Sequence, residues 1–187
     1  MVTTPRRAQL LDVAAELMAD RGFHGVSIND LGAAAGVSGP AVYRHFTSKQ
    51  AVLGEMLISI SQRLLDTGRQ RVAAASSPAE ALTALIAWHV EFALSEPKLI
   101  RVQDRDLAST SAADRQQVRQ LQRAYAEVWV QQLCRVRPEL GESVARARVH
   151  AVFGLLNSTP YSGKGLDADS MAALLRSLGS AALLAPG

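Results

Sequence analysis

The chain has 187 residues, of which 48% are hydrophobic and 20% are charged, so it is long enough to bury a core and is not wholly disordered. Its formal net charge of +3 is too small to indicate a nucleic-acid partner by itself. Cys134 is the only cysteine, which excludes a disulfide within one chain and favours a reducing, cytoplasmic location. Aromatic residues are few and β-branched residues seldom occur in runs, so we expect helices nearly throughout.

Two helices are predicted at the start of the chain. The first runs from about residue 6 to residue 21, where apolar residues recur at helical spacing. Gly22 ends it, because glycine adopts the left-handed conformation of a helix C-terminus at little cost. Ser27 is the expected N-cap of the second helix, and Asp30, three residues later, completes a weak form of the capping box.

A tight turn and a very short third helix follow. Gly36 lies where the turn requires a positive φ, and Ser38 is the expected N-cap of the third helix. Pro40 falls in the first turn of this helix, where the missing N–H is not needed. Two helices joined by a glycine turn are common, so this pattern alone is consistent with a helix-turn-helix or with an ordinary αα-corner.

The rest of the chain also predicts helices and contains no alternating strand pattern. Thr47 or Ser48 caps a long fourth helix. Further helices are predicted over about residues 79–92, 97–107, 114–137, 142–159 and 168–184. We therefore expect an all-α fold of about nine helices. Three helices over residues 1–47 precede a bundle of five or six helices over residues 48–187.

The segment after the third helix favours DNA binding. Tyr43-Arg44-His45-Phe46, followed by Thr47-Ser48-Lys49, combines one residue for packing with several that can contact a polyanion. With this segment, the chain from about residue 6 to residue 57 resembles the N-terminal domain of TetR-family transcriptional regulators. The resemblance also depends on the order and spacing of Leu11-x-x-Ala14-x-x-Leu17, Gly22-Phe23, Ser27-Ile28-x-Asp30-Leu31 and Ala35-Gly36-Val37-Ser38.

The resemblance implies that residues 1–47 form a helix-turn-helix DNA-binding domain and that residues 48–187 form a ligand-binding and dimerisation domain. It also implies that the helix from Ser38 to Arg44 is the recognition element. Arg44 is expected to contact guanine O6 and N7. For Tyr43 the alternative is packing in the core, and for His45 it is a surface position without a partner. The residues expected near base edges are Ser38, Gly39, Pro40, Ala41 and Arg44. The residues expected to contact phosphates are Ser27, Tyr43, His45 and Lys49.

The resemblance also implies a homodimer that binds a palindromic operator in double-stranded DNA, because one short recognition helix reads only a few base pairs. The last two predicted helices are the candidates for the interface, since the final helix is apolar on more than one face. Burial of this surface within one chain is the alternative. The candidate interface residues are Val149, Val152, Leu156, Leu174, Leu175 and Leu178.

A hydrophobic small-molecule effector is expected among the fifth to eighth helices, because aromatic residues with a few polar groups are typical of a binding pocket. The same residues are equally typical of a core. The segment at residues 98–106 and the arginine-rich helix after it are similar to family members that sense acyl metabolites, which suggests a fatty acyl or CoA thioester ligand. The candidate ligand-binding residues are Trp88, His89, Phe92, Gln103, Tyr125, Trp129, Phe153 and Asn157.

No motif indicates an enzyme, a cofactor or a metal site. The histidines lack the spacing of metal ligands, and no GxSxG sequence is present. The sequence has no signal peptide and no apolar run long enough to cross a bilayer, so no membrane partner is expected. We expect a dimeric repressor that its effector releases from DNA. The alternatives are an activator, a regulator that responds to another protein, and a helical small-molecule-binding protein without DNA affinity.

Overall fold

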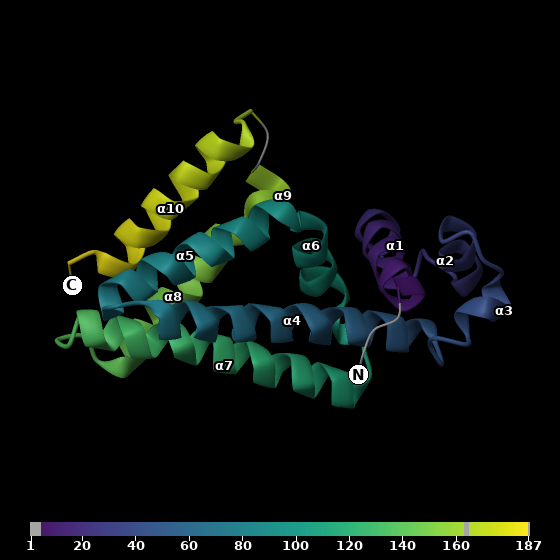
Figure 1. Ribbon diagram of the computed structural model, residues 1–187, viewed down its shortest axis with the longest axis horizontal. Coiled ribbons are helices and arrows are strands. Elements are labelled where there is room, and N and C mark those ends of the chain that lie inside the picture. Colours follow the sequence, from purple (N-terminus) through teal and green to yellow (C-terminus); the bar gives the residue numbers. More distant parts are fainter. Residues whose placement is uncertain (1–4, 163–164, 187) are drawn as a thin grey trace. The chain divides into compact units, whose positions relative to one another are not determined.

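The computed structural model describes residues 5–162 and 165–186, and over these residues its regular structure is helical, as predicted (Figure 1). A short 3-10 helix, η1, spans Leu107–Ser109. The α-helices are α1 (Pro5–Arg21), α2 (Ile28–Ala34), α3 (Gly39–Val42), α4 (Lys49–Ala74), α5 (Pro78–Ser95), α6 (Pro97–Asp106), α7 (Ala112–Val136), α8 (Glu142–Leu156), α9 (Thr159–Ser162) and α10 (Ala168–Leu184).

The eighth helix is shorter than predicted, and a separate helix follows it. Helix α8 ends at Leu156, and α9 begins at Thr159. Pro160 occupies the first turn of α9, where a missing N–H is tolerated. The Thr159 hydroxyl donates to the carbonyl of Ala93 at 2.7 Å, which ties α9 to α5.

The chain divides into two compact units. The first, the head unit, comprises the chain up to Ile60 and Lys98–Arg119. The second, the bundle unit, comprises Ser61–Pro97 and the chain from Gln120 onward. Helices α4 and α7 contribute residues to both units, and α6 belongs to the head unit. The head unit is larger than the DNA-binding domain expected at residues 1–47, and that functional boundary stays a prediction.

The glycine turns and the N-cap of α4 in the head unit have the geometry that their residue types predict. Gly22 and Gly36 have φ values of 76° and 70°, the left-handed conformation expected of them. Ser48, rather than Thr47, caps α4, because its hydroxyl accepts the N–H of Ala51 at 3.0 Å. The core includes residues from α6 and α7 as well as from α1–α4: Leu10, Ala14, Met18, Phe23, Val26, Leu31, Val42, Phe46, Val52, Leu53, Leu57, Val102 and Val118.

In the bundle unit, α10 packs against both α5 and α8. The core of this unit contains Leu82, Leu85, Val90, Tyr125, Trp129, Leu133, Val149, Val152, Leu156, Met171, Leu175 and Leu183, among others. Two arginines hold the C-terminal end of α10. Arg137 donates to the carbonyl of Leu184 at 2.6 Å, and Arg148 donates to that of Leu183 at 3.1 Å. These bonds satisfy carbonyls that a helix C-terminus otherwise leaves unpaired.

None of the helices described here combines the length and the apolar character that a bilayer-crossing segment requires.

Candidate DNA-binding and effector sites

The predicted recognition helix presents polar and aromatic side chains to solvent from an apolar base. Val42 and Phe46 are buried in the head unit and anchor the segment. Tyr43 and Arg44, between them, are exposed, and Tyr43 keeps 57% of its surface accessible. The alternative that Tyr43 packs in the core therefore does not hold, and both side chains can reach a partner.

Arg7 fixes the segment after α3 to α1 and α4. Its guanidinium donates to Glu55 at 2.6 Å from Nε, forms an ion pair with the same carboxylate, and also donates to the carbonyl of His45. The guanidinium carbon lies 4.3 Å from the centre of the Phe46 ring. These contacts hold the backbone of His45, whose side chain is half-buried, beside the exposed pair.

Ser27 and Asp30 form a complete capping box at the start of α2, stronger than the sequence suggested. The Ser27 hydroxyl accepts the N–H of Asp30 at 3.1 Å, and the Asp30 carboxylate accepts the N–H of Ser27 at 2.8 Å. Hydrogen bonds from the Ser27 hydroxyl and backbone lower the pKa of Asp30. Ser38 occupies the N-cap position of α3, but its side chain makes no capping bond.

The Lys49 ammonium, expected to contact a phosphate, is bonded to the protein's own backbone in this structure. Its Nζ donates to the carbonyls of Phe23 and Val26, each at 2.6 Å, and lies 4.3 Å from the centre of the Phe23 ring. Lys49 is the first residue of α4, so these contacts join α4 to the loop between α1 and α2.

Most of the predicted ligand-binding residues meet in the core of the bundle unit. The His89, Tyr125 and Phe153 rings lie nearly parallel, with centroids 5.0–5.8 Å apart. Trp129 stands at 82–89° to all three of them. Phe92 makes an edge contact with His89, and Asn157 completes the group. These contacts define an aromatic cluster contributed by α5, α7 and α8: His89, Phe92, Tyr125, Trp129, Phe153 and Asn157.

The polar atoms of this cluster are neutral and mostly paired. His89 Nε2–H donates to Oδ1 of Asn157 at 3.0 Å, and Nδ1 accepts the Tyr125 hydroxyl at 3.4 Å. Burial lowers the pKa of His89 to about 4, against the opposing effect of Asn157, and raises the pKa of Tyr125. The Trp129 indole N–H is buried and has no well-formed hydrogen bond among the described residues, although its proximity to the Tyr125 hydroxyl opposes the rise of that pKa.

The other two candidates lie elsewhere. The Trp88 indole borders the core and donates to the carbonyl of Leu64 at 3.4 Å. Gln103 lies on α6 and belongs to the head unit, whereas the cluster belongs to the bundle unit.

A close approach between α4 and α7 lets Tyr125 reach the cluster. A Cβ atom on Gly68 of α4 would lie 2.7 Å from Cε2 of Tyr125, too close for any other residue unless the ring moved. Glycine at this position therefore allows the ring to pack against the α4 backbone.

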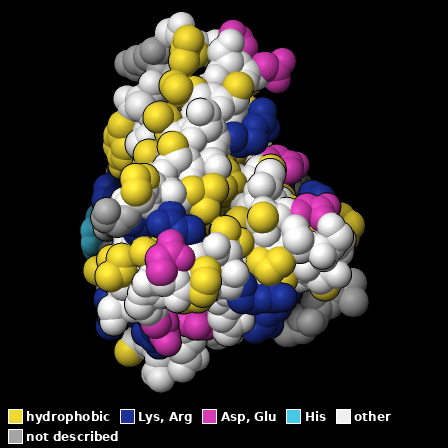
Figure 2. All heavy atoms as spheres, turned by 90° about the vertical axis from the view of Figure 1, so that its left-hand side faces the viewer, with side chains coloured by type: hydrophobic (Ala, Val, Ile, Leu, Met, Phe, Trp, Pro, Cys, Tyr) yellow, Lys and Arg dark blue, Asp and Glu magenta, His cyan; other side chains and the backbone are white. Residues whose placement is uncertain are grey.

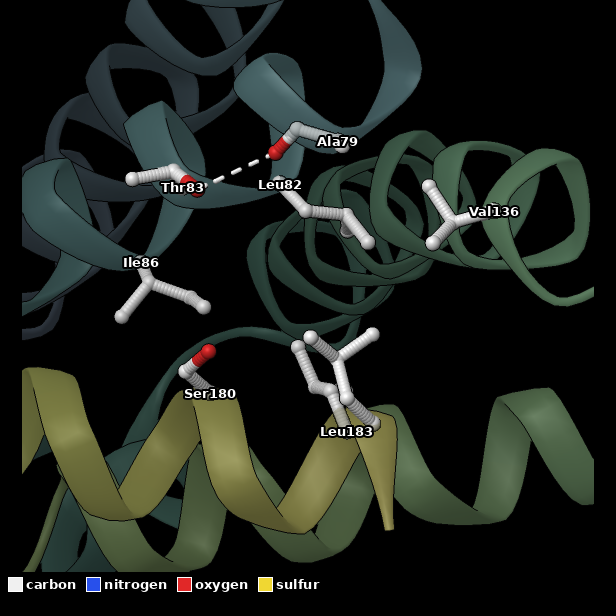
Figure 3. Close-up of a pocket in the computed structure, with 8 residues that line it drawn as sticks. Ala79, Leu82, Thr83, Ile86, Val136, Ser180 and Leu183 are labelled. Carbon is white, nitrogen blue, oxygen red and sulfur yellow. Dashed lines mark hydrogen bonds between the residues drawn. The ribbon is translucent and has the colours of Figure 1, made fainter. Parts of the chain in front are cut away.

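Two open spaces among the described residues of the bundle unit have linings that sequence reasoning missed. An apolar cavity of about 90 Å³ lies between the start of α5 and the ends of α7 and α10 (Figure 3). Its only side-chain hydroxyls are Thr83, which donates to the carbonyl of Ala79 at 3.1 Å, and Ser180. A wider groove of about 360 Å³ runs between α4 and α7, lined by Arg69, Val72, Ala73, Ala124, Glu127, Val128, Gln131 and Gln132. No local sequence signal marks either space, because ordinary helix-face residues line both.

The predicted dimer surface needs correction. Val149, Val152, Leu156 and Leu175 lie in the core of the bundle unit and are at most 4% exposed, so they cannot form the outer face of an interface. Leu174 and Leu178, in contrast, are 43% and 44% exposed on α10. Hydrophobic side chains gather over α10 in the upper part of the face in Figure 2. Val144, at the start of α8, is 50% exposed as well.

The residues that the structure describes contain no group of three or more His, Cys, Asp or Glu side chains arranged to hold a metal ion.

Comparison with known proteins identifies the family. The sequence matches the family model for bacterial regulatory proteins of the tetR family over residues 10–56, and a tetracyclin repressor-like C-terminal domain over residues 75–174. The HTH-type transcriptional repressor KstR2 of Rhodococcus jostii is 28% identical over 126 residues, which cover 67% of this chain but only 62% of that protein.

Solved structures share the fold. A TetR-family transcriptional regulator from Bordetella parapertussis matches with a TM-score of 0.83 at 24% identity, covering 96% of this chain and 94% of that one. FadR from Bacillus subtilis in complex with stearoyl-CoA matches with a TM-score of 0.78 at 17% identity, covering 96% and 99%. Because the C-terminal match alone covers more than half of the sequence, this protein belongs to the TetR family of transcriptional regulators, which are DNA-binding proteins and not enzymes.

Proposed function

We propose that this regulator is a homodimeric repressor that binds a palindromic operator and is released from it by a hydrophobic small molecule. The observation that carries the DNA-binding part is the exposed Tyr43–Arg44 pair, held at the end of α3 by buried Val42 and Phe46. Repression is supported by the description of the Rhodococcus jostii relative as a transcriptional repressor.

The DNA contacts divide by chemistry. Arg44 presents a guanidinium to guanine O6 and N7, while Ser38, Gly39, Pro40 and Ala41 lie near base edges, Gly39–Ala41 being the start of α3. Ser27, Tyr43 and His45 contact phosphates from the two ends of the helix pair. Arg44 therefore determines base preference, and the phosphate contacts determine affinity on every sequence.

Dimerisation involves the exposed apolar residues of α8 and α10. Val144, Leu174 and Leu178 are all more than two-fifths exposed, and a second copy of the same surface would cover them. A symmetric pair places two recognition helices about 34–36 Å apart, one turn of DNA.

The effector is proposed to carry a fatty acyl group, either free or as a CoA thioester. FadR of Bacillus subtilis binds stearoyl-CoA in its solved structure, which supports this ligand class for a chain of the same fold. The rings of the aromatic cluster pack against one another, so an acyl chain that enters between them must move them apart. The apolar cavity beside α10 and the groove between α4 and α7 offer open space without that rearrangement.

Fluorescence anisotropy with duplex DNA from upstream of the protein's own gene tests this function. We expect binding at low ionic strength that weakens steeply as salt rises, and release when stearoyl-CoA is added. CoA alone is the matched control. Release by no acyl compound would favour a regulator that responds to another protein, and tighter binding with the acyl compound would favour an activator. Failure to bind any duplex at low salt would reject DNA binding itself.

Sedimentation tests the dimer. Leu178→Lys is expected to produce monomers, because it places a charge in the proposed interface, whereas Leu166→Lys, at an exposed position outside the helices, should leave the dimer intact. A monomeric wild-type chain would contradict the proposed assembly.

A further inference from the structure

One peptide unit in the head is held from both sides. The Phe23 N–H donates to Oδ2 of Asp106 at 3.2 Å, and the Phe23 carbonyl accepts Nζ of Lys49 at 2.6 Å. Asp106 is the last residue of α6, and Lys49 is the first residue of α4. The loop between α1 and α2 is therefore fixed by two helices that lie far from it in sequence.

Lys49 directs most of its hydrogen-bonding capacity at these internal contacts. Lys49 gives a second hydrogen bond to the Val26 carbonyl at 2.6 Å and lies over the Phe23 ring at 4.3 Å. An ammonium has three N–H donors, so two of them are directed at carbonyls and away from solvent. Bonds of this kind, between a charged donor and an oxygen, are roughly twice as strong as neutral ones.

Asp106 is held just as firmly on the other side. It is 5% exposed, and Arg105 donates to its carboxylate from Nε at 3.1 Å and from Nη2 at 3.0 Å. Arg105 also donates to the carbonyl of Met18, at the end of α1. A buried carboxylate without such partners would be costly, so the Arg105 fork keeps Asp106 in place as an acceptor for Phe23.

The clamped loop leads directly into the DNA-binding surface. Val26 precedes Ser27, the N-cap of α2, and α2 packs closely against α3. A shift of the loop would therefore shift the start of α2 and, through the α2–α3 packing, the exposed Tyr43–Arg44 pair.

We infer that Lys49 and Asp106 are positioning residues that clamp the Phe23 peptide and so orient α2 and α3 for DNA, and that Lys49 does not itself bind a phosphate. This inference rests on the proposed DNA-binding function. It replaces the phosphate contact expected of Lys49 from the sequence.

The opposite charges of Lys49 and Asp106 make the inference testable by the direction in which DNA affinity changes when each charge is removed. Removing the negative charge of Asp106 should strengthen DNA binding if only long-range electrostatics mattered. The clamp predicts the opposite, because loss of the carboxylate releases the Phe23 N–H. Likewise, loss of a phosphate-binding lysine lowers the salt dependence of binding, whereas loss of a positioning lysine leaves it unchanged.

The experiment measures DNA affinity of the full chain by anisotropy over a range of salt concentrations. Lys49→Met and Asp106→Ala are each expected to weaken binding about tenfold or more, with the slope of log K against log salt unchanged. The double variant should be weakened by less than the product of the two single effects, because both act on the same peptide. Arg44→Ala is the control: it should relax base preference, which the two clamp variants should leave unchanged.

Two results would overturn the clamp. One is a salt slope that is smaller in Lys49→Met by about 0.9, the value expected when one phosphate is no longer neutralised. The other is binding by Asp106→Ala that is as tight as wild type or tighter.

If either variant fails to fold, NMR of the wild-type protein still tests whether Lys49 stays on the two carbonyls. The ¹³C carbonyl shifts of Phe23 and Val26 should stay unchanged on adding DNA if Lys49 remains on these oxygens. Movement of Lys49 to a phosphate would shift both resonances and contradict the inference. A wild-type chain that binds no duplex would reject the proposed function. The clamp would then be tested in the free protein, where Lys49→Met should shift the same two carbonyl resonances.

Discussion

Around α3 in the head unit, functional side chains point to solvent, whereas in the bundle unit the aromatic side chains point to one another. Tyr43 is 57% exposed, but Tyr125 is 4% exposed and is enclosed by His89, Phe153 and Trp129. The proposed DNA-binding surface is therefore exposed without DNA, while the residues predicted to hold an effector contact one another. Substitutions in the first region should change affinity, and substitutions in the second should change stability.

The largest effect is expected from Trp129→Ala. The indole is fully buried, so its removal should lower the free energy of unfolding by about 3–5 kcal/mol. Urea denaturation measures this, and Trp88→Ala, at the half-buried edge of the same core, is the control with a smaller loss. If Trp129→Ala lost its response to the effector but kept its stability, the cluster would be a pocket wall rather than a core.

Acidification should weaken the bundle unit through His89. Burial lowers its pKa from 6.5 to about 4, so the unfolded chain takes up a proton before the folded one does. The contribution of neutral His89 is complete above pH 6.5 and is lost as the pH falls from 6.5 to 4, by up to about 3 kcal/mol.

The control for this titration is a second histidine variant. Stability measured by urea at several pH values should fall less steeply in His89→Gln than in wild type, while exposed His150→Gln should follow wild type. Identical pH profiles for wild type and His89→Gln would show that His89 is not held neutral by its surroundings.

Arg44→Ala should affect DNA binding and leave stability almost unchanged. Loss of a bidentate guanine contact costs about 1–3 kcal/mol of affinity and relaxes base preference at one position. Competition binding with single-base operator variants measures both effects. Arg176→Ala, exposed on α10, removes the same side chain from the bundle unit and should change neither. Unaltered base preference in Arg44→Ala would exclude direct reading by this residue.

The smallest effect is expected from the serine caps. Ser27→Ala removes a reciprocal capping box and should destabilise the head unit by about 1 kcal/mol. Ser38→Ala is the matched control, since its hydroxyl makes no capping bond at the start of α3. Thermal denaturation compares the two. Equal losses in both variants would mean that the capping box at α2 contributes nothing.

Local signals allowed much of the head unit to be predicted from the sequence. Positive φ at Gly36 and capping by Ser27 depend on a few neighbouring residues, and both are found as expected. The sequence also predicted the helices of the bundle unit closely. It did not reveal the compact unit that joins α6 to the head, because that grouping depends on contacts between distant segments such as Asp106 and Phe23.

Site residues in the bundle unit were harder to assign for the same reason. An apolar or aromatic residue at helical spacing is equally suited to a core, a pocket or an interface, and only packing decides which. The structure assigns Val152 and Leu156 to the core and leaves Leu178 exposed, although all three share the same pattern. Lys49 shows the same limit for a charged residue, because nothing in its neighbourhood in sequence points to the carbonyl of Phe23.

The close approach at Gly68 also bears on attempts to make the protein more thermostable. Replacing a glycine inside a helix with alanine is a standard stabilising change, worth roughly 1 kcal/mol where the new methyl group meets only solvent. In α4 that methyl group would instead press on the Tyr125 ring from 2.7 Å and disturb the stacked rings behind it. A consensus-guided design that treats α4 as an isolated helix would thus weaken the bundle at a position that helix propensity alone would select for improvement.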